Sequence, residues 1–100
     1  MIAEIQCLPT PAGTDEHRYA HVDAAIAVIE ASGLHWEVGP LGTSVEGPPD
    51  ALWAVVRRAH EAGLAAGADG VVSVIKVAEA GADGADTGPS IADLVEKFRS

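Results

Sequence analysis

Residues 34–47 constrain the fold of this chain more than any other segment. Their sequence, LHWEVGPLGTSVEG, places Gly39, Pro40 and Gly42 between two short runs in which apolar and polar residues alternate. Such a pattern predicts a β-hairpin whose turn lies at the glycines and the proline. Because successive side chains of a strand point to opposite faces, Ser44 and Glu46 fall on one face of the second strand.

The segments before the hairpin predict one strand and one helix. Residues 2–8 alternate in polarity, and the prolines at positions 9 and 11 are expected to end that strand. From about residue 16 to residue 32, apolar residues recur at steps of three and four, and Gly33 stands where a left-handed helix cap is expected. This predicts an amphipathic helix with one buried stripe: Tyr19, Val22, Ile26 and Ile29.

The segments after the hairpin predict a second helix, a fourth strand and a short terminal helix. Prolines and an acid at residues 48–50 suit a first helical turn, and Gly67 is expected to end that helix. Residues 71–77 are rich in β-branched side chains, which favour a strand. An acidic, glycine-rich loop follows at residues 79–89, and residues 90–93 resemble a capping box for a helix that runs through Phe98. The buried side of the second helix is expected to be Leu52, Val55, Val56, Ala59 and Ala62.

The predicted order, βαββαβ and then a short helix, indicates an α+β ferredoxin-like sandwich. We expect one domain over residues 1–100, with a four-stranded antiparallel sheet and both main helices on one face. The inward residues should include Ala3, Ile5, Cys7 and Val45. In this topology the first and third strands pair at the centre of the sheet. The helix-free face should therefore bring together four polar residues: Glu4, Gln6, Ser44 and Glu46.

Composition excludes some classes of partner. The formal net charge of −9 argues against nucleic acid and anionic membranes, because both require neutralisation by Lys and Arg. Cys7 is the only cysteine, so no internal disulfide is possible. The chain begins without a basic segment or an apolar signal segment, and no run is long enough to span a membrane, which together predict a cytoplasmic protein. A core built mainly from small side chains favours self-association.

Five segments, read together, resemble the thiamine-binding protein family. The most specific are the Leu-Gly-Thr-x-Val-Glu-Gly and Ala-His-Glu-Ala stretches at their observed spacing. The resemblance covers roughly the first 78 residues and rests on the following stretches: IAEIQCLP (2–9), EASGL (30–34), PLGTSVEG (40–47), RAHEAG (58–63) and IK (75–76).

This resemblance implies a non-catalytic protein with a ferredoxin-like fold. Such a protein holds thiamine or its hydroxymethylpyrimidine half as ligand, needs no further cofactor or metal, and forms a dimer or tetramer through its sheet. A thiazolium cation and an aminopyrimidine suit contacts with carboxylate, hydroxyl and aromatic groups. The candidate ligand-binding residues are therefore Glu4, Gln6, Trp36, Thr43, Ser44 and Glu46. The loop at residues 79–88 departs from the family pattern because it lacks Lys and Arg, which disfavours a phosphorylated ligand.

Each of these residues has a structural alternative. Glu4 and Glu46 can be ordinary carboxylates on a solvated face, or can pair with Lys76 on the neighbouring strand. Thr43 and Ser44 also suit a strand and a turn for their own sake. Trp36 enters the core or joins the open face, depending on a register that the sequence leaves open.

Histidine and cysteine chemistry has less support. His17 and His21 share a helical face but lack further metal ligands, so we expect an exposed helix start. His60 follows Trp53 on one stripe of the second helix, which is typical of a packed or subunit-facing edge. Cys7 is expected to be a small core residue. An enzyme built on these histidines is the weakest of three hypotheses, behind ligand binding and a regulatory or structural oligomerisation module that has no small-molecule ligand.

Overall fold

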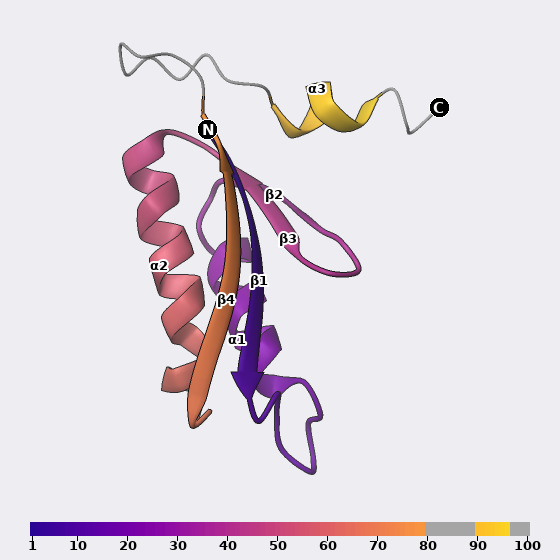
Figure 1. Ribbon diagram of the computed structural model, residues 1–100, viewed down its shortest axis with the longest axis vertical. Coiled ribbons are helices and arrows are strands. Elements are labelled where there is room, and N and C mark those ends of the chain that lie inside the picture. Colours follow the sequence, from indigo (N-terminus) through magenta and orange to yellow (C-terminus); the bar gives the residue numbers. More distant parts are fainter. Residues whose placement is uncertain (80–89, 97–100) are drawn as a thin grey trace.

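The computed structural model describes residues 1–79 and 90–96, and within them it contains one sheet and three helices (Figure 1). The α+β order agrees with the sequence prediction. The elements along the chain are β1 (Ile2–Thr10), α1 (Ala20–Glu30), β2 (His35–Val38), β3 (Thr43–Glu46), α2 (Pro49–Ala65), β4 (Gly70–Ala78) and α3 (Ile91–Val95).

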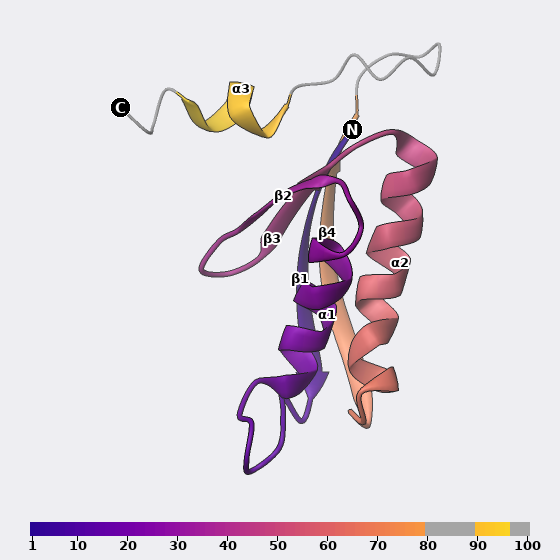
Figure 2. The same ribbon diagram turned by 180° about the vertical axis from the view of Figure 1, so that it is seen from behind.

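The sheet has the strand order β2-β3-β1-β4, and every pairing between neighbouring strands is antiparallel. Helices α1 and α2 cover the same face, as the two opposite views show (Figure 2). This is the ferredoxin-like sandwich expected from the element order. Strands β1 and β4 have nine residues each, whereas β2 and β3 have four each. The hairpin therefore flanks only the first half of β1.

The core lies between the sheet and the two helices. Strand β1 alternates as predicted, since Ala3 and Ile5 are buried under the helices whereas Glu4, between them, is exposed on the other face. Helix α2 buries four of its five expected positions, and Ala62 is half-buried. The buried core cluster comprises Met1, Ala3, Ile5, Ala25, Ile29, Val45, Leu52, Val55, Val56 and Ala59.

Two predicted boundaries are wrong. Strand β1 continues through Pro9 to Thr10, because among the described residues no strand flanks its second half on the β3 side, and a proline without an N–H is tolerated at such an edge. Helix α1 begins at Ala20 rather than near residue 16. The preceding segment is held in turns, in which the Thr14 N–H donates to the His17 carbonyl at 2.9 Å.

His21 differs most from expectation. It is buried rather than exposed, and its Nδ1 lies 2.7 Å from the carbonyl oxygen of Pro11. The buried stripe of α1 is accordingly His21, Ala25 and Ile29, whereas the predicted members Val22 and Ile26 are only half-buried and Tyr19 is exposed. Gly33 has a φ of +79°, in agreement with the predicted left-handed cap.

Helix α3 lies within the predicted terminal helix, whose last residues, including Phe98, are outside the described residues. The predicted acidic loop also falls outside them, apart from Glu79. In the described ranges, no helix has the length and apolar content needed to cross a membrane.

Candidate functional site

The helix-free face holds four of the six predicted ligand-binding residues, as the alternation required. Glu4 lies opposite Ser44 on β3 and opposite Lys76 on β4. Gln6 lies beyond the reach of β3 and faces Val74. The structure thus brings Glu4 and Ser44 together, while Gln6 sits farther along the strand.

Glu46 is engaged by the C-terminal helix. Its Oε2 accepts a hydrogen bond from the backbone N–H of Ile91 at 2.9 Å, and its Oε1 lies 3.9 Å from Nε2 of His35. Ile91 is buried, and so is Ile2, which pairs with Glu46 across the sheet. This end of the open face is therefore covered by α3, and the Glu46 carboxylate anchors that helix.

Trp36 and Thr43 lie on the helix-covered side of the sheet. Trp36 pairs with Val45, which pairs with Ala3, so the three side chains share one face and the question of Trp36 orientation is answered. Thr43 pairs with Ile5 on the same side and is buried. The six predicted residues consequently do not form one cluster.

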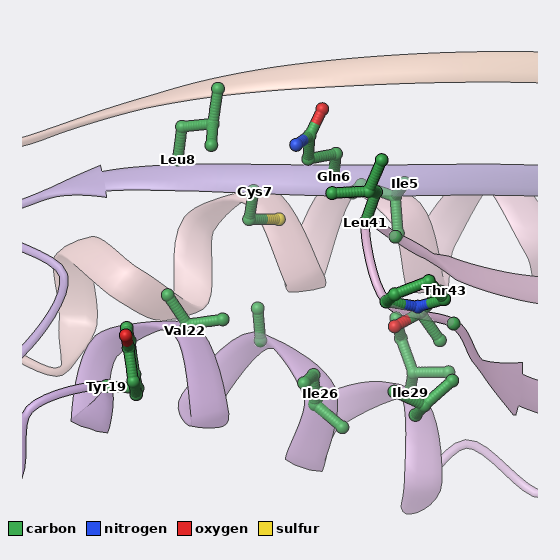
Figure 3. Close-up of a pocket in the computed structure, with 15 residues that line it drawn as sticks. Ile5, Gln6, Cys7, Leu8, Tyr19, Val22, Ile26, Ile29, Leu41 and Thr43 are labelled. Carbon is green, nitrogen blue, oxygen red and sulfur yellow. The ribbon is translucent and has the colours of Figure 1, made fainter.

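A cavity of about 270 Å³ lies on the helix-covered side, between β1, α1 and the hairpin turn (Figure 3). Cys7 and Ile5 project from β1 towards α1, whereas Gln6 and Leu8 leave the opposite side of the strand and border the cavity at its edge (Figure 3). Gln6 and Thr43 are the two predicted residues in its lining. The lining comprises Ile5, Gln6, Cys7, Leu8, Tyr19, Val22, Ala25, Ile26, Ile29, Val38, Gly39, Pro40, Leu41, Gly42 and Thr43.

The short hairpin creates this cavity. Strand β3 pairs with β1 only from Ile2 to Ile5, and the hairpin then turns back through a hydrogen bond from the Gly39 N–H to the Gly42 carbonyl at 2.8 Å. Within the described residues, the next stretch of β1 is paired with β4 alone. Since a strand edge presents N–H and C=O groups, the cavity is bordered by main-chain hydrogen-bonding capacity as well as by apolar side chains.

A carboxylate stands beside the rim of the cavity. A Cβ atom placed on Gly42 would meet Glu4 Cγ at 3.3 Å and Glu4 Cδ at 3.5 Å, so the Glu4 side chain lies against the hairpin turn. Gly42 itself lines the cavity. The Glu4 carboxylate therefore lies beside the rim, whereas no charged side chain is among the described lining residues.

Cys7 lines the cavity and also contacts Ser73, which is hydrogen-bonded to His60 between β4 and α2. The Ser73 hydroxyl donates to Cys7 Sγ at 3.5 Å, and Ser73 Oγ lies 2.6 Å from Nδ1 of His60. Burial raises the pKa of the Cys7 thiol, and the hydrogen bond from Ser73 opposes that rise. A thiol with a raised pKa is a weak nucleophile at neutral pH, which agrees with a packing role for Cys7.

The lining of the cavity is mainly apolar. In the described ranges, no three His, Cys, Asp or Glu side chains converge to hold a metal ion. Small-molecule sites are typically concave and apolar with a few polar groups, and this cavity lies near the lower limit of their usual volumes, roughly 300 Å³. Thr43 and the edge of β1 are among the polar groups that border it.

The sequence pattern does not reveal the contribution of α1 to this site. It predicts Val22 and Ile26 as core residues and Leu41 as part of a turn, yet all three line the cavity. One signal is present in the sequence: the two arms of the hairpin are much shorter than residues 71–77, the predicted strand on the other side of the first strand. Unequal strand lengths leave part of the longer strand unflanked.

A family model described as "Thiamine-binding protein" matches residues 3–98 of the chain. A UPF0045 protein of Clostridium perfringens is 37% identical over 67 residues, which cover 67% of this chain and 70% of that protein. The match by family model includes every lining residue of the cavity and all six predicted ligand-binding residues.

Solved structures share the fold. A Bacillus cereus domain of unknown function, DUF77, superposes with a TM-score of 0.79 at 34% identity, covering 99% of this chain and 91% of that one. A Thermotoga maritima protein assigned provisionally to thiamine biosynthesis or salvage gives a TM-score of 0.73 at 26% identity, covering 98% and 97%.

Proposed function

Because the chain belongs to the thiamine-binding protein family, we propose that it binds thiamine or its hydroxymethylpyrimidine moiety in the cytoplasm without transforming it. The observation that carries this proposal is the uncharged cavity between β1 and α1. The provisional assignment of the Thermotoga maritima relative to thiamine biosynthesis or salvage supports the same class of ligand.

The aminopyrimidine ring is the half of thiamine that suits the cavity. It is neutral, flat and apolar on its faces, and its edge carries an amino donor beside ring-nitrogen acceptors. The unflanked edge of β1 and the hydroxyl of Thr43 offer complementary groups. Tyr19, which is 57% exposed and lines the cavity, offers an aromatic surface for stacking.

The thiazolium ring then extends past the hairpin turn towards Glu4. Its permanent positive charge favours a carboxylate, and the Glu4 side chain lies against Gly42 at the rim. A phosphorylated ligand gains nothing here, because no Lys or Arg is among the described lining residues. Of the six predicted residues, the proposed site therefore includes Glu4, Gln6 and Thr43. It does not include Ser44, Glu46 and Trp36.

Titration calorimetry with hydroxymethylpyrimidine, thiamine and thiamine pyrophosphate tests this proposal. We expect heat with the first two ligands and no tighter binding of the pyrophosphate. Val22→Phe should fill the cavity and abolish binding of both, while Glu46→Gln, at the end of the open face that α3 covers, should leave both affinities unchanged. Thermal melts of each variant check that it folds.

Substitution of Glu4 sharpens the test. Glu4→Gln should weaken thiamine binding by a factor of about two to five, the size of an exposed ion pair, and should leave the pyrimidine affinity unchanged because the pyrimidine lacks the cation. Absence of heat with every ligand at millimolar concentration contradicts the function. Binding that survives Val22→Phe contradicts the site.

We propose as the second candidate an oligomerisation module without a small-molecule ligand. It is favoured by an apolar stripe on the helix-free face, where Leu8, Val72 and Val74 are 46%, 65% and 49% exposed. Adjoining exposed apolar side chains are typical of interaction surfaces. A stable dimer or tetramer that shows no response to any of the three ligands favours this candidate over the first.

A further inference from the structure

Every second residue of β1 directs its main-chain N–H and C=O away from β4. On the β3 side, the carbonyl of Met1, directly before β1, accepts a hydrogen bond from the Gly47 N–H at 3.1 Å. On the β4 side, the Thr10 carbonyl accepts one from the Asp69 N–H at 2.7 Å. Because these directions alternate along a strand, odd-numbered residues point towards β3 and even-numbered residues towards β4. Pro9 fits this alternation, since the N–H that it lacks would point away from β4 and costs no bond of that ladder.

Cys7 is the residue at which the alternation places a main-chain donor and acceptor beside the cavity. The pairing of β1 with β3 ends at Ile5, opposite Thr43. Cys7 is the next residue with the same main-chain direction, it lines the cavity, and no strand of the described residues pairs with it on that side. Gln6 and Leu8 border the same cavity although their side chains leave the opposite face of β1, so the cavity reaches around the strand edge (Figure 3).

The thiol of Cys7 is engaged on another side. It donates to the carbonyl oxygen of Ala59 on α2 at 3.8 Å and accepts a hydrogen bond from the Ser73 hydroxyl at 3.5 Å. The main chain is therefore the polar part of Cys7 that is directed along the edge of the sheet. Main-chain groups in apolar surroundings are almost always hydrogen-bonded. A ligand in the cavity can supply the partner for this N–H and this C=O.

We propose, on the basis of the function proposed above, that the N–H and C=O of Cys7 are the recognition pair of the cavity. In an antiparallel sheet such a residue exchanges two hydrogen bonds with the residue opposite, one donated and one accepted. A flat heterocycle whose edge carries an acceptor beside a donor replaces that opposite residue. The aminopyrimidine has this edge, because a ring nitrogen accepts from the N–H and the neighbouring amino group donates to the C=O. The ligand class is therefore rings with an amidine-type edge, and rings that carry the acceptor alone bind more weakly.

Amide exchange measured residue by residue tests the direction of the pair in the free protein. The Cys7 amide should exchange at least about tenfold faster than the amides of Gln6 and Leu8, which bond to β4. A Cys7 amide that exchanges as slowly as its two neighbours in the free protein overturns the proposed direction.

The same measurement with saturating hydroxymethylpyrimidine tests recognition. Exchange of the Cys7 amide should slow at least about tenfold, while the amides of Gln6 and Leu8 keep their rates. If calorimetry shows that the pyrimidine binds and the Cys7 amide does not respond, the recognition pair is overturned and the proposed function still stands.

Cys7→Pro and Cys7→Ala form a matched pair of variants. Both remove the thiol, but only proline removes the N–H, and it spares the ladder with β4 as Pro9 does. Cys7→Pro should bind hydroxymethylpyrimidine about tenfold more weakly than Cys7→Ala in calorimetry. Thermal melts check that both variants fold. Equal affinities in the two variants overturn the recognition pair.

A ligand analogue in which a methyl group replaces the amino group tests the class of ligand. The unmodified chain should bind it about tenfold more weakly than hydroxymethylpyrimidine, because the donor to the Cys7 carbonyl is lost. The Gln6 side-chain amide also carries a donor beside an acceptor, so the comparison is repeated in Gln6→Met, where the preference for the amino form should persist. Loss of the preference in that variant assigns it to Gln6 and overturns the Cys7 pair. Absence of binding by both ligands contradicts the proposed function, and the recognition pair is then rejected with it.

Discussion

The two halves of β1 differ in what lies beside them. The first half, up to Ile5, is flanked by β3 on one side and β4 on the other, and its inward side chains are almost completely buried. The second half is flanked by β4 alone and borders the cavity. One continuous strand thus contributes to the core at one end and to the candidate binding site at the other. The difference arises from the length of the neighbouring hairpin and not from β1 itself.

The largest expected effect contrasts the two halves in stability. Ile5→Ala removes a side chain that is 3% exposed in the flanked half, and it should lower the free energy of unfolding by about 2–5 kcal/mol. Leu8→Ala, at a position that is 46% exposed in the unflanked half, should cost less than about 1 kcal/mol. Urea denaturation measures both. Equal losses would mean that the halves do not differ as the packing indicates.

The next largest effect is on pyrimidine affinity, and it distinguishes the two faces of β3 beside the end of the flanked half of β1. Thr43 lines the cavity, whereas Ser44 points to the open face. Thr43→Val should weaken pyrimidine binding about two- to tenfold through loss of one hydrogen bond, and Ser44→Ala should leave it unchanged. Calorimetry on both variants decides the matter. The reverse result would return the site to the open face.

A smaller effect is expected on the local stability of α3, which covers the end of the open face at Glu46. Glu46→Ala removes the acceptor of the Ile91 N–H, so local opening of α3 should become easier by about 1 kcal/mol. Amide exchange at Ile91 should then accelerate about fivefold, while amides of β1 keep their protection. His35→Gln serves as the control, because His35 lies 3.9 Å from the same carboxylate without contacting Ile91 N.

The smallest effect lies in the unflanked half and changes reactivity rather than stability. Because burial raises the pKa of the Cys7 thiol, alkylation by iodoacetamide should rise at a higher pH in the folded protein than in urea. The folded state holds this proton more tightly, so its contribution to stability is present at neutral pH and is lost at alkaline pH. Ser73→Ala removes the opposing hydrogen bond and should raise the pKa further. A profile unchanged on unfolding would contradict the burial of Cys7.

The sequence predicted the architecture well because alternation and turn residues act locally. Gly39, Pro40 and Gly42 marked the hairpin, and alternation placed Ala3 and Ile5 in the core and Ser44 and Glu46 on the open face. These assignments need only the period of a strand and the order of the elements.

The candidate site was less predictable because it depends on spacing between elements. The sequence grouped Glu46 with Glu4, and nothing in it indicated that Ile91, 45 residues later, would bond to the Glu46 carboxylate. Burial of His21 likewise follows from a loop that brings the Pro11 carbonyl to its ring. The cavity arises because β3 ends before the second half of β1. Sequence periodicity predicts the strands themselves, but it does not predict the space left where one strand ends before its neighbour.

The length of the β2–β3 hairpin therefore determines the volume of the cavity and with it the size of ligand that fits. Two more residues in each arm would extend β3 alongside Gln6 and Cys7, pair the free edge of β1 and close the cavity, while two fewer would enlarge it. Lengthening leaves the buried core and the order of the strands unchanged, and shortening removes only the buried Thr43 from β3. Relatives that differ only in the length of the hairpin arms would share one fold and accept ligands of different size. The length of these arms is therefore the first feature to compare when ligands are assigned across the family.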